Sequence, residues 1–274
     1  MIANLYKIEC LTNMHVGSGE VNYNIVDNEV EKDPVSNRPV IYASSLKGAL
    51  RSYCEERVDQ FSNQRVDLDY IFGSSRMASK ENEEKTEKGN YKFLEAQIME
   101  RPLRTSKGNA SSISVTSIDA VKQFYSRLKN FGFETKVEEN ELSKYLEALT
   151  FSGEKVFFVT ENIKHCEIEG YRTEVLGQED HCFDFLKQYL GDSFAITTDQ
   201  ILRTFDLPVM ARNQLNNGIS QNLWYEEVVP YTSTFYFIIL RPDGTNDALS
   251  FEDLVQIGGN ASIGYGFTKI KKVL

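Results

Sequence analysis

The sequence predicts an α+β protein built on an antiparallel sheet. Strand-like and helix-like segments alternate along the chain without the regular strand–helix–strand spacing that is typical of parallel α/β folds. No internal repeat is visible in the 274 residues, which excludes the repeat architectures. Two segments near the ends of the chain, 4–11 and 231–240, carry the alternating or dense apolar patterns of strands in a sheet with a buried face.

The remaining elements follow from local patterns. After the first strand, five apolar residues recur at the i, i+3, i+4, i+7 and i+8 spacing of one helix face: Leu46, Ala49, Leu50, Tyr53 and Cys54. Ser44 or Ser45 is well placed as the N-cap of this helix. A strand is predicted next at 92–99, a loop at 101–108 because of its proline and glycine, and helices at 116–128 and 249–257.

Composition limits the class of protein. The hydrophobic content of 41% and charged content of 26% are ordinary globular values and exclude a wholly disordered chain. No apolar run approaches the ~20 residues of a membrane span, and the N-terminal residues lack the pattern of a secretion signal. The four cysteines form no CxxC pair. We therefore expect a cytoplasmic protein with reduced thiols and no membrane partner.

The charge of the chain is unevenly distributed. Its net charge of −10 repels phosphate on average, which argues against nucleic-acid binding by the surface as a whole. The segment 134–184 holds thirteen acidic and five basic residues, whereas 97–129 holds six basic and two acidic residues. A local basic strip can bind phosphate while the acidic surface faces elsewhere, so the net charge does not exclude an RNA partner.

The glycines near the C-terminus form the most unusual local pattern. Four glycines occur in the nine residues from Gly258 to Gly266, and such a segment lets backbone approach backbone or a phosphate group. The segment does not match the P-loop pattern and does not open a βαβ unit, so a nucleoside triphosphate or dinucleotide site is disfavoured. From the residues alone, a tight turn before the last strand is the main interpretation.

No single motif identifies a catalytic centre. The chain has no G-x-S-x-G segment. His165-Cys166 and His181-Cys182 lack the x2–4 spacing within each half of a zinc site, and adjacent strand residues point to opposite faces. Asp27 lies between apolar residues upstream of the predicted helix, and its sequence context alone indicates an ordinary turn residue.

Several segments taken together, in this order, resemble the RAMP proteins of type III CRISPR systems. The segments that carry this resemblance are 15–19 (HVGSG), 25–28 (IVDN), 39–51 (PVIYASSLKGALR) and 258–266. Two further stretches, 101–108 (RPLRTSKG) and 222–230 (NLWYEEVVP), resemble the backbone subunits of type III-B (Cmr) effector complexes in particular. Many relatives have proline-glycine where this chain has Tyr42-Ala43, and 134–184 contains nothing diagnostic.

The resemblance implies a specific fold and domain organisation. We expect a single RAMP domain over 1–274 with a ferredoxin-like (RRM-like) palm, an acidic inserted helical segment over about 130–195, and a protruding thumb hairpin over about 209–223. The dipeptide Asn217-Gly218 in the middle of that last segment is a strong hairpin-turn signal in its own right. In the family, such a thumb wedges into the guide–target duplex, here with apolar residues such as Leu215 and Ile219.

The resemblance also implies site residues. Asp27 matches the family's cleavage aspartate and is expected to bind Mg²⁺ or Mn²⁺ near the scissile phosphate, with His15 and Glu227 as candidate helpers in catalysis. A second set is expected to contact guide RNA through phosphates or close backbone approach: Ser45, Lys47, Arg51, Arg104, Gly258, Gly259 and Asn260.

The implied function is that of a metal-dependent endoribonuclease. Repeated copies of the chain would line a guide RNA together with other type III-B effector subunits, and would cut complementary target RNA at regular intervals by attack of the RNA's own 2′-hydroxyl. One alternative is a structural RAMP scaffold that holds guide RNA without cutting, for which Asp27 would be dispensable. Another is a guide-processing endonuclease, which the 224–227 (WYEE) block disfavours.

Overall fold

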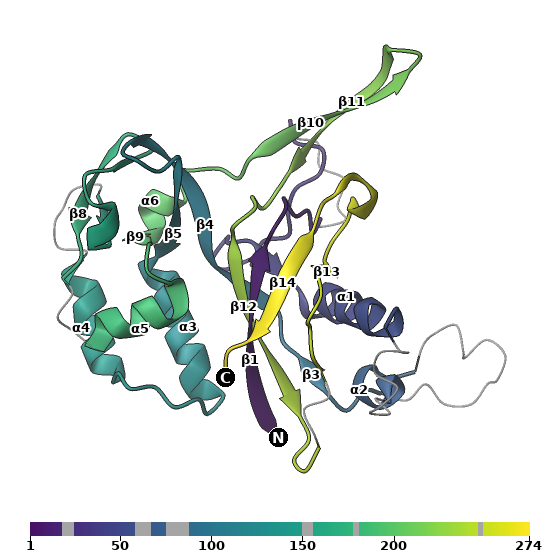
Figure 1. The fold of residues 1–274 in the computed structure, drawn as a ribbon, viewed down its shortest axis with the longest axis horizontal. Helices are drawn as coiled ribbons and strands as arrows, with labels where there is room; N and C mark the ends of the chain where they lie inside the picture. Colours follow the sequence, from purple (N-terminus) through teal and green to yellow (C-terminus); the bar gives the residue numbers. More distant parts are fainter. Residues whose placement is uncertain (18–24, 58–66, 75–87, 150–155, 178–180, 246–248) are drawn as a thin grey trace. The chain divides into compact units, whose positions relative to one another are not determined.

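The structure is a computed structural model that describes residues 1–17, 25–57, 67–74, 88–149, 156–177, 181–245 and 249–274 (Figure 1). The chain divides into two compact units. Unit 1 comprises 1–97, 208–231 and 235–274, and unit 2 comprises 98–207 and 232–234. Each unit combines strands with helices, so the α+β prediction is confirmed. In the described part of the chain, no helix is long and apolar enough to cross a membrane.

Unit 1 is organised around a sheet in which four strands lie in the order β13-β14-β1-β12, with β3 beside β12. Their bounds are β1 Ile2–Cys10, β3 Lys92–Phe93, β12 Thr234–Arg241, β13 Val255–Gln256 and β14 Phe267–Lys272. The first and last strands of the chain pair in antiparallel fashion, from Tyr6 opposite Lys272 to Cys10 opposite Thr268. Tyr6 is buried and stacks on Phe237 with ring centroids 5.1 Å apart. The strands predicted at 4–11 and 231–240 are therefore confirmed.

Helix α1 (Ala43–Glu55) lies beside β13 and follows the short strand β2 (Val40–Ile41). Its buried face contains Leu46, Leu50 and Tyr53, as the apolar spacing predicted. The expected serine N-cap is wrong. The helix starts earlier, with Tyr42 as N-cap and no side-chain capping bond, so that Ser44 and Ser45 occupy the first turn.

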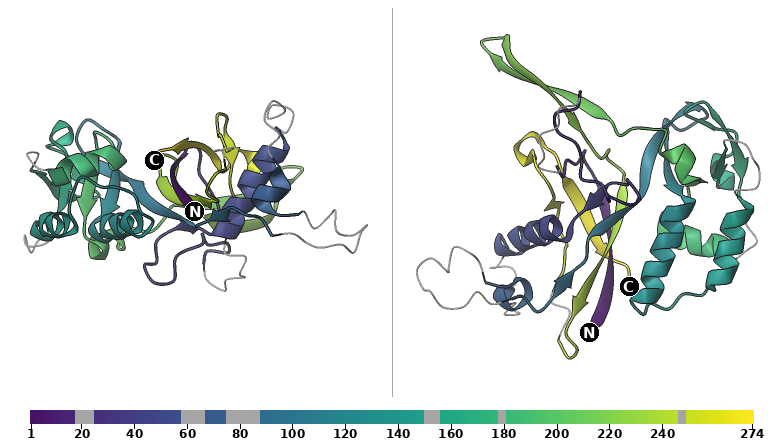
Figure 2. Two further views of the ribbon diagram at one scale, coloured as in Figure 1. Left: turned by 90° about the horizontal axis from the view of Figure 1, so that it is seen from below. Right: turned by 180° about the vertical axis from the view of Figure 1, so that it is seen from behind.

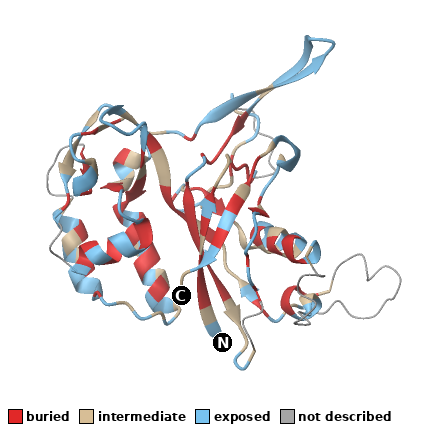
Figure 3. Cartoon of the chain, viewed as in Figure 1, coloured by how far each residue is buried: buried red, intermediate tan, exposed pale blue. Residues whose placement is uncertain are grey.

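Strands β10 (Val209–Asn216) and β11 (Ile219–Glu227) form an antiparallel hairpin that projects from the rest of unit 1 (Figure 2). Asn217 and Gly218 at its tip both have positive φ, 50° and 80°, as the favoured two-residue hairpin turn requires. The predicted hairpin is confirmed. Most of its side chains are exposed (Figure 3), including Leu215 at 61% and Ile219 at 66%.

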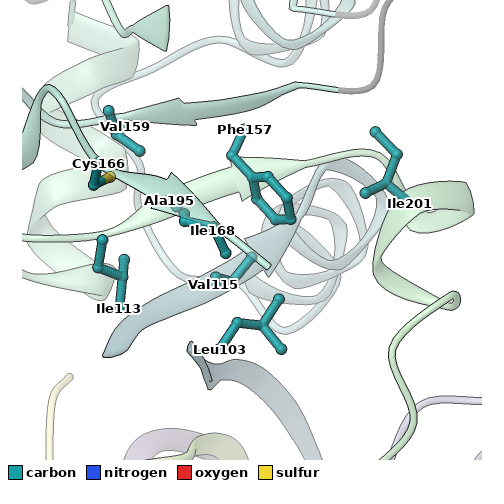
Figure 4. Packing of buried hydrophobic residues seen from close by; sticks show 9 residues of the cluster. All are labelled: Leu103, Ile113, Val115, Phe157, Val159, Cys166, Ile168, Ala195 and Ile201. Carbon is teal, nitrogen blue, oxygen red and sulfur yellow. The ribbon is translucent and has the colours of Figure 1, made fainter. Parts of the chain in front are cut away.

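Unit 2 contains a closed ring of paired strands. The pairings run β4-β5-β9-β6-β8-β7, and β7 pairs back with β4. The strands are β4 Ala96–Lys107, β5 Ser112–Ser117, β6 Phe157–Val159, β7 Glu167–Ile168, β8 Tyr171–Val175 and β9 Ala195–Thr197. Buried side chains from these strands, among them Leu103, Val115 and Phe157, pack together to form a hydrophobic core (Figure 4).

The helices of unit 2 are α3 (Ile118–Asn130), α4 (Glu139–Ala148), α5 (His181–Leu190) and the short α6 (Asp199–Leu202). Helices α3 and α5 are joined by edge-on ring contacts, Phe124 with Tyr189 and Tyr125 with Phe185. Helix α3 confirms the helix predicted at 116–128, with Ser117 as its N-cap accepting from the Ala120 N–H at 3.2 Å.

Three segments differ from their predicted structure. The stretch 101–108 belongs almost wholly to β4 rather than to a loop, because buried Leu103 pairs with buried Ile113 on β5. The predicted strand at 92–99 is interrupted between β3 and β4. The predicted helix at 249–257 is absent: Val255–Gln256 form β13, and residues 249–254 form neither helix nor strand.

The segment over about 130–195, expected to be helical, is mixed. It contains α4 and α5, but also the strands β6, β7 and β8 and a short 3-10 turn at Glu161–Ile163. Strand β6 is a three-residue run that is buried completely, which gives no alternation from which a strand could be predicted.

Candidate functional site

The end of β11, at the foot of the hairpin, binds the loop that carries Asp27. The main-chain N–H groups of Asp27 and Asn28 donate to the carbonyl of Tyr225 at 3.0 and 3.2 Å. The N–H of Tyr225 in turn donates to Asp27 Oδ2 at 2.7 Å, and that of Glu227 donates to the Asn28 carbonyl at 2.9 Å. The strand thus fixes Asp27 through backbone bonds, while the Asp27 side chain remains exposed.

Glu227 supports the same loop from the other direction. Its side chain is 9% exposed, and its two carboxylate oxygens accept from the Val30 N–H at 3.0 Å and from Lys32 Nζ at 2.9 Å. Both oxygens of Glu227 are therefore occupied by groups of the chain itself. Such an arrangement holds the loop from Asp27 to Lys32 in place and leaves no oxygen of this carboxylate unpaired.

His15 connects β11 to the glycine-rich segment. Its ring Nδ1 donates to the Glu227 carbonyl at 2.7 Å, and its own carbonyl accepts from the Gly259 N–H at 2.8 Å. Gly258 has φ of 88°, and a Cβ atom there would clash with the His15 carbonyl oxygen. Glycine at position 258 is thus required by the close approach of two backbones.

The structure brings several of the residues expected from the sequence into one site. Asp27 is hydrogen-bonded to Tyr225, and His15 is hydrogen-bonded to Glu227. Tyr225 and Glu227 are two positions apart on β11, which corresponds to about 7 Å along that strand. Gly258, Gly259 and Asn260 lie against the same His15 backbone or the adjacent Glu226 side chain. Of the segment 15–19, Ser18 and Gly19 lie outside the described residues.

Glu226, a buried carboxylate that was not predicted as a site residue from the sequence, lies on the same end of β11. Glu226 accepts hydrogen bonds from Trp224 Nε1 at 2.9 Å, Arg212 Nε at 3.1 Å and Asn260 Nδ2 at 3.0 Å. Burial raises the pKa of Glu226, but the hydrogen bonds from Trp224 and Arg212 and the charges of Arg212 and His15 outweigh it and hold that pKa below its ordinary value. Glu226 is therefore ionised at neutral pH.

The basic residues of α1 differ in how strongly they are engaged. Arg51 donates to Glu55 at 2.6 Å, to the Gly73 carbonyl at 2.6 Å and to Asp69 at 3.1 Å, which ties α1 to α2 (Leu68–Phe72). Lys47 is half-buried, and its pKa is lowered by this burial and by the nearby charges of Lys92 and Arg51. Ser45 is exposed in the first helical turn. An anion next to Lys47 would relieve this repulsion among cations.

Arg104 belongs to unit 2, where it lies on β4. Its guanidinium forms an exposed ion pair with Glu169 at 3.3 Å, and the Arg104 side chain is 76% exposed. Exposed pairs of this kind contribute at most about 1 kcal/mol, so the guanidinium can exchange Glu169 for a phosphate at little cost.

Asp27 is the residue whose chemistry suits a metal ion. One of its oxygens accepts from the Tyr225 N–H, and within the described ranges the other makes no hydrogen bond. No group of three or more His, Cys, Asp or Glu side chains that could hold a metal occurs among the residues whose positions are described. This donor set fits Mg²⁺, which takes one or two carboxylates and fills its remaining positions with water and phosphate oxygens. It does not fit an ion enclosed by protein ligands.

The chain is similar over nearly its whole length to two Cmr4 proteins. The chain is 28% identical over 294 aligned positions to the CRISPR system Cmr endoribonuclease Cmr4 of Pyrococcus furiosus, an alignment that covers 98% of this chain and 95% of the relative. It is 24% identical to the CRISPR system CMR subunit Cmr4 of Saccharolobus solfataricus, over 97% of this chain and 95% of that protein.

Solved structures share the fold over the whole chain. The Type III-B Cmr-beta bound to cognate target RNA contains a chain with a TM-score of 0.76 at 21% identity, covering 100% of this chain and 98% of that one. The oligomeric Cmr4 from Pyrococcus furiosus matches with a TM-score of 0.69 at 23% identity, over 100% of both chains. These structures show the fold that the chain shares, and the near full-length similarity to the Cmr4 of Pyrococcus furiosus confirms the resemblance to type III-B backbone subunits. A family model described as the RAMP superfamily matches residues 7–269, and the chain belongs to that superfamily.

Proposed function

We propose that this chain is the repeated backbone subunit of a type III-B CRISPR effector complex and that it cuts target RNA paired to a guide RNA. The similarity to Cmr4 proteins over nearly the whole chain supports this assignment. The observation that carries it is the position of Asp27, an exposed carboxylate held by backbone bonds at the foot of an exposed hairpin. The subunit would work in the cytoplasm, with copies of itself and other effector subunits as partners.

Guide RNA would bind to unit 1 at two places. The first turn of α1 has N–H groups without a side-chain cap, next to Ser45 and Lys47, and such groups favour phosphate oxygens. At the glycine-rich loop, the small residues Gly258 and Gly259 are exposed and let an RNA backbone come close. Both contacts are local, which is how a chain of net charge −10 can hold RNA. The sheet of unit 1 would supply the ferredoxin-like palm.

Cleavage would occur at the exposed carboxylate of Asp27. The 2′-hydroxyl oxygen next to the scissile bond would attack phosphorus and lose its proton to solvent. The bond from phosphorus to the 5′-oxygen would break, and that oxygen would take up a proton from solvent. The products are a 2′,3′-cyclic phosphate and a 5′-hydroxyl end. Asp27 would hold a Mg²⁺ or Mn²⁺ ion, which supplies positive charge beside the phosphate. His15 and Glu227, both buried, would keep the Asp27 loop and the glycine-rich loop in register.

The hairpin would act as the thumb. Its exposed apolar side chains, including Leu215 and Ile219, have no apolar cover within the described part of this chain. Inserting apolar groups between bases costs a few kcal/mol of stacking and displaces a nucleotide from the duplex. A displaced nucleotide leaves its phosphate free to adopt the in-line geometry that attack by the 2′-hydroxyl needs.

The direct test uses the chain in its complex. We expect a reconstituted effector complex with a defined guide to cut an end-labelled complementary RNA into a regularly spaced ladder whose fragments carry cyclic phosphate ends. Neither a non-complementary RNA nor a complementary DNA should be cut. A complex that binds the complementary RNA without cutting would instead identify a structural scaffold.

A further inference from the structure

Glu226 connects three segments of unit 1. Its side chain is 8% exposed, and each of its three hydrogen-bond donors comes from a different place: Arg212 from β10, Trp224 from β11 and Asn260 from the glycine-rich loop. The loop is held there by left-handed backbone at Asn260, with φ of 63°. A buried carboxylate with donors from both hairpin strands and from a distant loop fixes these segments relative to one another.

The same short stretch of β11 also holds the Asp27 loop. The main chains of Tyr225 and Glu227, which flank Glu226, make the bonds to Asp27 and Asn28. A shift of Glu226 therefore displaces the backbone that holds Asp27. We infer that Glu226 is a positioning residue, which fixes the foot of the hairpin against the glycine-rich loop and thereby sets the place of the Asp27 carboxylate. This inference rests on the proposed function and assigns to it a residue beyond Asp27, His15 and Glu227.

The contacts require an ionised carboxylate rather than any polar group. Three donors converge on Glu226, and a glutamine amide would direct its own NH₂ group at one of them. Arg212 depends on Glu226 for charge compensation, since its guanidinium lies over the Tyr265 ring at 4.4 Å and its Nη2 atom is buried without a hydrogen-bond partner in the described structure. Removing the charge at Glu226 leaves this guanidinium partly buried and unpaired, which favours displacement of β10.

A positioning role and a purely structural role predict different results. If Glu226 only stabilises the fold, its loss lowers guide binding, target binding and cleavage together. If it positions Asp27, its loss lowers the cleavage rate of target that is already bound. Misplacing a reacting group by about 1 Å can reduce the rate as much as 100-fold while leaving binding intact.

The test compares Glu226→Gln with Glu56→Gln. Glu56 is an exposed glutamate in an ion pair with Arg57 at 3.5 Å, makes no contact with the hairpin among the described bonds, and serves as matched control. In the complex, Glu226→Gln should reduce the rate at saturating target roughly 10-fold to 100-fold, with guide and target affinities within about twofold of wild type. Glu56→Gln should change neither.

Trp224, the single tryptophan of the chain, reports on the same contacts without RNA. In the isolated subunit, Glu226→Gln should shift its fluorescence emission. The double variant Glu226→Gln/Asn260→Asp should restore the emission, because the introduced amide then donates to the new carboxylate at position 260, which pairs with Arg212.

Two results would overturn the inference: wild-type emission and cleavage in Glu226→Gln, or equal losses of binding and cleavage in that variant. Failure of the wild-type complex to cut would refute the proposed function, while the emission data would still decide whether Glu226 joins these segments.

Discussion

Asp27 is attached to β11 by its own main-chain N–H and by the main chain of Asn28, and its side chain is exposed, so its carboxylate can be removed without opening a cavity. We predict that Asp27→Ala abolishes target cleavage and leaves assembly and target binding nearly unchanged. Loss of the bond from the Tyr225 N–H should cost about 1 kcal/mol of stability. Cleavage and target binding are measured on the same preparation of complex.

Asp27→Asn is the matched control for this prediction. Its amide oxygen can still accept from the Tyr225 N–H, so the loop should keep its stability while the negative charge is lost. We expect Asp27→Asn to be as inactive as Asp27→Ala but as stable as wild type. Retention of the wild-type rate in either variant would remove Asp27 from the cleavage chemistry.

Glu226 gives a pH dependence that can be measured on the isolated subunit. Its pKa in the folded protein lies below the ordinary value of 4.5, so its stabilising contribution is complete above that value and is lost as the pH falls through the lowered pKa. The free energy of unfolding of wild type should therefore exceed that of Glu226→Gln at pH 7, and the difference should shrink below about pH 4.5. Parallel curves between pH 7 and pH 3 would contradict this assignment.

Sequence reasoning reached the site residues unequally. Asp27, His15 and Glu227 emerged because they lie in segments that resemble a family. Glu226 was not predicted as a site residue, because nothing in the WYEE block shows which of its two adjacent glutamates accepts several hydrogen bonds. Its bonds to Arg212 and Asn260 join residues 14 and 34 positions apart, a separation at which no local pattern carries information.

Among the elements, the hairpin offers the clearest separation of function from stability. Deleting Asn213 to Ser220 leaves Arg212 opposite Trp224, with residues 221–223 available as a short turn. We predict that this variant keeps the thermal transition of the subunit and abolishes the regularly spaced ladder. The double variant Leu215→Ser/Ile219→Ser should weaken the ladder through the loss of apolar groups alone. An unchanged ladder after the deletion would show that this hairpin is not the thumb.

Helix α1 makes a prediction about guide binding. Lys47→Ala should weaken binding and lower the slope of log affinity against log salt concentration by about 0.7, the value for one phosphate contact on single-stranded RNA. Lys271→Ala on β14, an exposed lysine in the same unit, is the control and should leave the slope unchanged. Filter binding over a salt series measures both, and equal slopes for all three proteins would exclude the Lys47 contact.

Arg51, although predicted from the same motif, is a less direct test of RNA binding. Its bonds to Glu55, Asp69 and the Gly73 carbonyl join α1 to α2, so Arg51→Ala should also lower stability.

The sequence predicted β1, α1, α3 and the hairpin correctly, because each of these elements is long enough to show its hydrophobic pattern or turn signal in the sequence. Two segments were predicted wrongly. Residues 101–108 were predicted as a loop because of their proline and glycine but lie almost wholly in β4, and 249–257 were predicted as a helix but contain only the short strand β13.

The resemblance predicted the family of the chain and the composition predicted a globular protein, but neither predicted the closed strand ring of unit 2. Its strands β6, β7 and β8 are three, two and five residues long, too short to show a period, and their pairing with β9 and β4 is set by contacts distant in sequence. The described parts of the acidic stretch 134–184 include β6, β7 and β8 of this ring, so the charge of those parts lies on a folded unit rather than on a linker.

Chelation tests the role of the metal. Because Asp27 offers a single free carboxylate oxygen among the described contacts, an ion bound there would take most of its ligands from water and RNA and should be removed readily. We predict that excess EDTA stops cleavage and leaves target binding intact, and that added Mg²⁺ or Mn²⁺ restores it. Cutting that persists in excess chelator would exclude the metal from the reaction.

The role of Asp27 in cleavage is tested most sharply with a guide-complementary, end-labelled RNA and complexes assembled with wild-type or Asp27→Asn subunits. We predict that both complexes bind the target equally, and that wild type alone converts it to a ladder of evenly spaced fragments with cyclic phosphate ends. Bound target that stays intact with wild type, or an identical ladder with Asp27→Asn, would refute cleavage by the Asp27 carboxylate.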